Sequence, residues 1–93
     1  MAGADHLITT ASTMVRDVAR MRQAAEAEGA RLLTLTVEAD VTFGAPADFD
    51  AFTEEVSAAV AALARKYAAP SGRRYRLTAV AHPAVAKSAP ARN

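Results

Sequence analysis

The sequence predicts an α+β fold: a helix–strand–helix–strand protomer whose two-stranded sheet is completed to four strands by homodimerisation. Two observations lead to this prediction. The spacing of the apolar residues changes twice along the chain, from a helical period of 3.6 to a strand period of 2. The chain also has only 93 residues and no cysteine, so it forms one small domain that no disulfide supports. Such a domain is marginally stable alone, and association with a second copy would relieve that shortage.

A first helix is predicted over residues 5–28. Apolar residues recur there at intervals of three and four, which places them on one stripe of an amphipathic helix. Gly29 follows and can end the helix in the left-handed conformation. The stripe consists of Leu7, Ile8, Ala11, Met14, Val15, Val18, Met21 and Ala25.

Two strands are predicted over residues 31–43 and 73–82, where apolar and polar residues alternate. Pro83 ends the second strand because proline cannot donate to a ladder. We expect one domain over residues 1–83, and a disordered tail over residues 84–93, where no period is visible. The apolar sides of the strands are Leu33, Leu35, Val37, Ala39, Val41 and Phe43 in the first, and Tyr75, Leu77, Ala79 and Ala81 in the second.

A second helix is predicted over residues 46–68, between the two strands. Pro46 suits the first helical position, where its missing N–H is not needed. Pro70 and the turn at Ser71 and Gly72 follow the end of this helix. Because a helix joins the strands, we expect them to run parallel through a right-handed crossover.

Two parallel strands leave both edges of their sheet unpaired and have little stability of their own. The simplest remedy is edge pairing with an identical chain about a two-fold axis. The result would be a four-stranded sheet with an antiparallel pair at its centre and four helices on its apolar face. The sequence therefore predicts a homodimer.

We expect a protein that is not an enzyme and binds neither a metal nor a cofactor. His6 and His82 are the only histidines, and neither has the further ligands that a zinc site needs. Glu38 and Asp40 would point the same way from a strand, which could serve acid–base chemistry. Such carboxylates more often pair with cations across strands, and the second strand carries arginines.

Charge and hydropathy argue against nucleic acid and membrane as direct partners. The net charge is +1, which gives no global attraction to anionic polymers or surfaces. The basic cluster of Arg73, Arg74 and Arg76 fits a solvated strand start better than a nucleic-acid contact. No signal peptide is visible and the helices carry too many charges to span a bilayer, so a soluble, cytoplasmic protein is expected.

A small-molecule pocket, if the chain has one, is expected between the aromatic rings of the second helix, the methionines of the first helix and the sheet. The same side chains would otherwise simply form the core. The candidate ligand-binding residues are Met14, Met21, Phe49, Phe52, Tyr67 and Tyr75.

Three short runs resemble the C-terminal half of actinobacterial ArsR-type winged-helix transcriptional regulators. They are residues 44–56 (GAPADFDAFTEEV), 63–67 (LARKY) and 72–83 (GRRYRLTAVAHP). Members of this family often have a Pro-x-Asp entry to a long helix, an Arg-Tyr near its end and a closing Arg-x-Tyr-Arg strand that ends in His-Pro. The resemblance covers residues 5–83 and implies a dimerisation and effector-sensing domain.

The chain also departs from the ArsR-type pattern. No helix-turn-helix precedes position 5, so DNA would be contacted only through a winged-helix domain absent from this chain. Ala45 stands where such regulators often have serine, and the thiolates of the metal-sensing members are missing. Metal sensing therefore does not transfer, and no family site residue is carried over.

Two functions follow from these observations. The first is a non-catalytic dimerisation and small-molecule-sensing domain of a bacterial transcriptional regulator. In it, a ligand would change the spacing of two attached DNA-binding heads by population shift. The alternative is a stand-alone dimeric ferredoxin-like α+β protein that binds a small molecule or acts as a small enzyme. A third option is a protein–protein adaptor.

Overall fold

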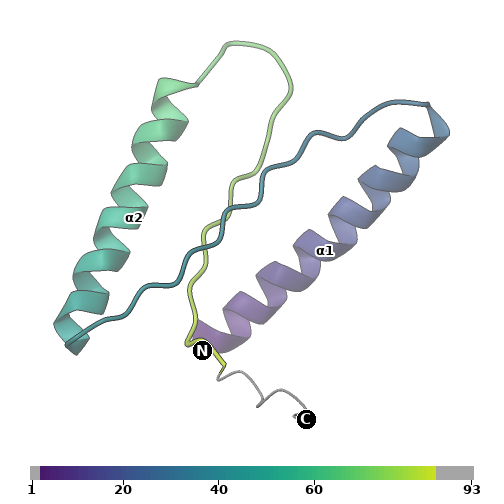
Figure 1. Cartoon of the computed structure of the whole chain (residues 1–93). Helices are drawn as coiled ribbons and strands as arrows, with labels where there is room; N and C mark the ends of the chain where they lie inside the picture. Colours follow the sequence, from purple (N-terminus) through teal and green to yellow (C-terminus); the bar gives the residue numbers. More distant parts are fainter. Residues whose placement is uncertain (1–2, 86–93) are drawn as a thin grey trace, which may run out of the picture. The chain divides into compact units, whose positions relative to one another are not determined.

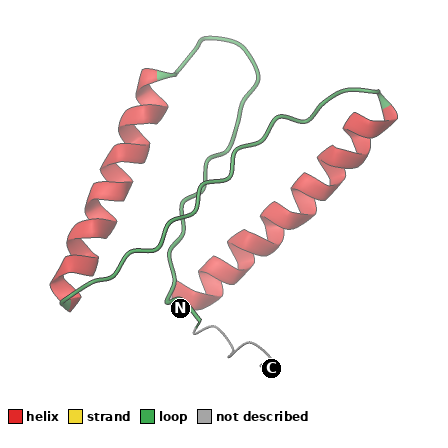
Figure 2. Cartoon of the chain, viewed as in Figure 1, coloured by secondary structure: helices red, strands yellow, loops and turns green. Residues whose placement is uncertain are grey.

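The computed structural model describes residues 3–85 and contains two helices, α1 (Gly3–Ala27) and α2 (Pro46–Lys66) (Figure 1). Within residues 3–85 there is no β-strand, and loops follow each helix (Figure 2). The chain divides into two compact units between Glu38 and Ala39. The first unit holds α1 and the start of the loop that follows it, and the second holds α2 and the loops on either side of it.

The predicted α+β fold is wrong for the part of the chain that the structure describes. Residues 31–43 and 73–82 are loops, so the two-stranded sheet and its completion to four strands by homodimerisation are not formed. An alternating pattern requires only that one side of an extended chain be apolar, whereas a strand also requires a neighbour to complete its hydrogen-bond ladder. Leu35 and Val37, predicted to face a core, are 77% and 78% exposed.

Helix α1 forms as predicted, beginning two residues earlier than expected and ending one residue earlier. It ends in a Schellman motif built on Gly29, whose φ of 67° only glycine adopts at little cost. The N–H of Ala30 donates to the carbonyl of Ala25 at 2.8 Å, and the N–H of Gly29 donates to that of Glu26 at 3.2 Å. The prediction that Gly29 stops this helix is confirmed.

Helix α2 begins at the predicted proline and ends two residues before the predicted end. Ala45 is its N-cap, with an extended backbone (φ −149°, ψ 154°) and no side-chain capping bond, because alanine has no acceptor. Arg65 and Lys66 lie in the last turn, where cations favour the negative end of the helix dipole. The N–H of Tyr67 donates to the carbonyl of Leu63 at 3.1 Å and closes the helix.

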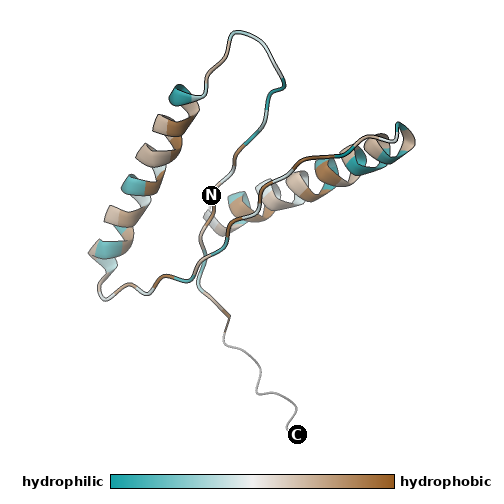
Figure 3. Ribbon diagram, turned by 45° about the horizontal axis from the view of Figure 1, so that its top comes forward, coloured by the Kyte–Doolittle hydropathy of each residue, from teal (hydrophilic) through white to brown (hydrophobic). Residues whose placement is uncertain are grey.

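No residue between 3 and 85 is buried, in either unit. Figure 3 shows apolar residues along both helices and in the loops. The single domain over residues 1–83 stays a prediction. Of the predicted disordered tail, residues 86–93 lie outside the described part, and Val85 is 89% exposed.

Candidate functional site

An aromatic cluster forms where the chain enters α2. The ring of Phe43 lies 5.4 Å from that of Phe49 and 5.2 Å from that of Phe52, measured between centroids. The interplanar angles are 88° and 60°, so both contacts are edge-to-face. This arrangement sets the positive edge of one ring against the negative face of the other.

The local sequence explains why these rings meet. Phe43 lies two residues before the N-cap and Phe49 is the fourth residue of α2, an arrangement similar to a hydrophobic staple that begins one residue earlier. Phe52 follows Phe49 by three residues and therefore lies on the same side of the helix. The hydroxyl of Thr53 donates to the carbonyl of Phe49 at 3.0 Å within the helix. Phe49 remains 44% exposed, so the cluster is open to an apolar ligand or to a partner.

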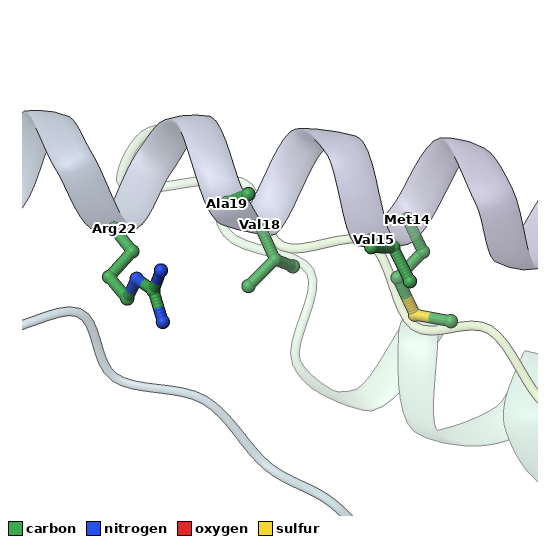
Figure 4. Close-up of a pocket in the computed structure, with 5 residues that line it drawn as sticks. All are labelled: Met14, Val15, Val18, Ala19 and Arg22. Atoms are coloured by element: carbon green, nitrogen blue, oxygen red, sulfur yellow. The ribbon is translucent and has the colours of Figure 1, made fainter.

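A second apolar feature lies on α1. A hollow of about 480 Å³ is lined by Met14, Val15, Val18, Ala19 and Arg22 (Figure 4). Figure 4 shows the side chains of Val15, Val18 and Arg22 projecting from the same side of the helix. The hollow is open, and its lining is hydrophobic apart from the guanidinium of Arg22.

The six predicted ligand-binding residues are distributed over both units. Met14 and Met21 lie on α1 and are 43% and 42% exposed, while Phe49 and Phe52 lie on α2. Tyr67 caps α2, with the ammonium of Lys66 5.5 Å from the centre of its ring, and Tyr75 lies in the following loop. The structure brings Phe49 and Phe52 together, and their ligand-binding role stays a prediction.

Phe43 is the member of the aromatic cluster that the predicted ligand-binding set omits. The alternating pattern assigned it to the end of a strand, among the residues facing a core. Its position three residues before Pro46, with further phenylalanines in the first two turns of the helix, is the signal that could have placed it.

Polar groups of the described residues form no metal-binding cluster. No group of three or more His, Asp or Glu side chains within residues 3–85 gathers closely enough to hold a metal ion. His82 Nδ1 lies 2.9 Å from the carbonyl of Pro83, to which it donates in the Nδ1–H tautomer. Glu38 and Asp40 are exposed in a loop rather than on a strand. Neither α1 nor α2 is long and apolar enough to cross a membrane.

Comparison with known proteins adds no family to this picture. No protein-family model matches the sequence, and no curated protein and no solved structure matches it. The likeness to ArsR-type regulators therefore stays a prediction from three short runs of residues.

Proposed function

We propose that this chain is a non-catalytic homodimerisation and small-molecule-sensing domain of a bacterial transcriptional regulator. Contact with DNA would come from a winged-helix domain outside this sequence, and the protein would act in the cytoplasm. The observation that supports the proposal most strongly is that no side chain of residues 3–85 is buried.

Apolar side chains lie open in both units. Ile8 and Leu35 of the first unit are 60% and 77% exposed, and Leu63 and Leu77 of the second are 49% and 58% exposed. Association with a second copy would cover such side chains and supply the hydrophobic free energy that the chain otherwise lacks.

Two observations support the sensing role. Phe43, Phe49 and Phe52 form an open apolar cluster, and aromatic side chains of this kind line most small-molecule sites. The cluster also fixes the junction between α2 and the loop before it. A ligand that binds the rings in only one arrangement of that junction would shift the population towards that arrangement. The attached DNA-binding heads would register the shift as a change in their spacing.

The stand-alone ferredoxin-like alternative requires a four-stranded sheet, which residues 3–85 do not contain. No observation favours a small enzyme or an adaptor over the regulator domain.

A fusion experiment tests the proposal directly. The full chain is joined behind a DNA-binding head that binds its operator only as a dimer, and repression of a reporter gene is measured. We expect repression by the fusion and none by the head alone. A fusion that represses no better than the isolated head would contradict dimerisation, and with it the proposed function.

Sensing is tested separately with indole as an aromatic probe. Indole should shift the NMR signals of the Phe43, Phe49 and Phe52 ring protons in a saturable manner. In the Phe49→Ala variant the affinity for indole should fall, and Leu35→Ala should leave it unchanged because Leu35 lies in the other unit. Shifts that never saturate would show that the cluster is not a binding site.

A further inference from the structure

The apolar stripe of α1 follows a strict heptad repeat. Counting from Ala4, apolar residues recur at alternating intervals of three and four through Ala25, which is the a/d pattern of a coiled coil. This pattern holds for three heptads and covers almost the whole of α1. The a positions are Ala4, Ala11, Val18 and Ala25, and the d positions are Leu7, Met14 and Met21.

None of these seven side chains is buried within the chain. Met14, Val18 and Met21 are 43%, 38% and 42% exposed. A seam of this length is stable only when a second helix covers it. The sizes of the residues at the a and d positions indicate which helix covers the seam and in which orientation.

Three of the four a residues are alanines and the fourth is Val18, whereas the d residues are leucine and methionine. In a parallel pair, a faces a and d faces d, so Ala11 would face the partner's Ala11 and leave a void. In an antiparallel pair the intervals of three and four are exchanged, so each a residue lies level with a d residue of the other helix. In two of the three layers an alanine then faces a methionine, and in the third Val18 faces Leu7, so no layer pairs two alanines or two methionines.

We infer that α1 pairs with α1 of a second copy as an antiparallel coiled coil, centred between Ser12 and Thr13. This inference rests on the proposed homodimer and names its interface. Each layer then occurs twice because of the two-fold axis. The layers are Ala4 against the partner's Met21, Leu7 against the partner's Val18, and Ala11 against the partner's Met14.

The residues that flank the seam select this register. Ile8 then lies beside the partner's Val15, which adds an apolar contact, and Asp17 lies beside the partner's Thr10, whose hydroxyl can donate to the carboxylate. Sliding the helices by one heptad, so that Met14 lies against the partner's Val18, would also keep each a residue level with a d residue. It would place Asp17 next to the partner's Asp17, and the two carboxylates would repel, an effect reduced because each pairs with Arg20 of its own helix at 2.7 Å.

The hollow on α1 fits the same interpretation. Four of its lining residues, Val15, Val18, Ala19 and Arg22, are spaced i, i+3, i+4 and i+7. This is the set of four that forms a hole for a side chain of a facing helix in knobs-into-holes packing. The hollow adjoins the seam at Met14 and Val18, so a partner helix on the seam would also cover it (Figure 4).

Disulfide trapping tests the orientation and the register. The chain has no cysteine, so each introduced thiol reports one position. Single-cysteine variants Ala11→Cys, Met14→Cys and Val18→Cys are prepared as full chains, with Met14→Cys carrying a mass tag. Pairs are mixed under mild oxidation and separated by mass without reductant, and circular dichroism confirms that each variant keeps its helices.

When Ala11→Cys is mixed with Met14→Cys, the main product should be a disulfide-linked pair that contains one chain of each variant and has the mass of two chains. Met14→Cys alone should remain mostly uncross-linked. Efficient cross-linking of Met14→Cys to itself would show a parallel pair. Preference for the mixture of Met14→Cys with Val18→Cys would show the other register. Either result overturns the inference.

Sedimentation of the wild-type chain separates the two proposals. A dimer by sedimentation that none of these mixtures traps would overturn the α1 interface and leave the homodimer standing. A wild-type chain that sediments as a monomer at every concentration would overturn both.

Discussion

Truncation of Met14 should weaken the dimer by a predictable amount. Full burial of a methionine side chain stabilises by about 1.5–3 kcal/mol. Met14 is 43% exposed in the chain, so covering its remaining surface is worth about 1 kcal/mol. Each dimer holds two copies, so Met14→Ala should raise the dimer dissociation constant by about 30-fold, equivalent to about 2 kcal/mol.

Sedimentation equilibrium over a range of concentrations measures this constant, and circular dichroism at high concentration checks that helix content is kept. Thr9→Ala is the matched control because Thr9 is exposed on the side of α1 away from the stripe, and its dissociation constant should stay within about twofold of the wild-type value. Equal weakening by both variants would mean that the effect is not specific to the seam. No weakening by Met14→Ala would place the interface elsewhere.

Three further variants test local features. Gly29→Ala should lower the free energy of unfolding by about 1 kcal/mol, because the φ of 67° at this position strains any residue with a Cβ. Gly3→Ala should not lower it, because Gly3 has open space around it and no such φ. Phe43→Ala should cost about 1–3 kcal/mol in the free energy of unfolding through the loss of two ring contacts, whereas Leu35→Glu should leave the fold intact by circular dichroism. Arg20→Ala removes the exposed ion pair of 2.7 Å between Arg20 and Asp17 within α1. The free energy of unfolding in urea titration should change by less than about 0.5 kcal/mol, and a larger loss would contradict the view that an exposed ion pair contributes little.

The two helices could be predicted because their signals are local. A repeat of three and four residues, a glycine at position 29 and a proline at position 46 each act within a few residues of the chain. The boundaries consequently agree with the structure to within two residues.

The loops could not be predicted in the same way, because strand formation depends on a neighbour that the sequence does not specify. The alternation over residues 31–43 fixes which side of the chain is apolar and leaves open what that side meets. The same prediction assigned Phe43 to a strand, although its ring packs against Phe49 and Phe52 of α2. A pattern with period 2 is therefore weaker evidence for a strand than its regularity implies when the chain holds only two such segments.

The length of α1 has a consequence for any segment that precedes it. In the antiparallel pair the first helical residues of the two copies, each Gly3, lie on opposite sides of the two-fold axis, about 29 Å apart at 1.5 Å per residue. Adjacent major grooves on one face of B-DNA are separated by about 34 Å. In the proposed regulator, the coiled coil would thus hold two DNA-reading heads at a spacing of nearly one turn of the double helix.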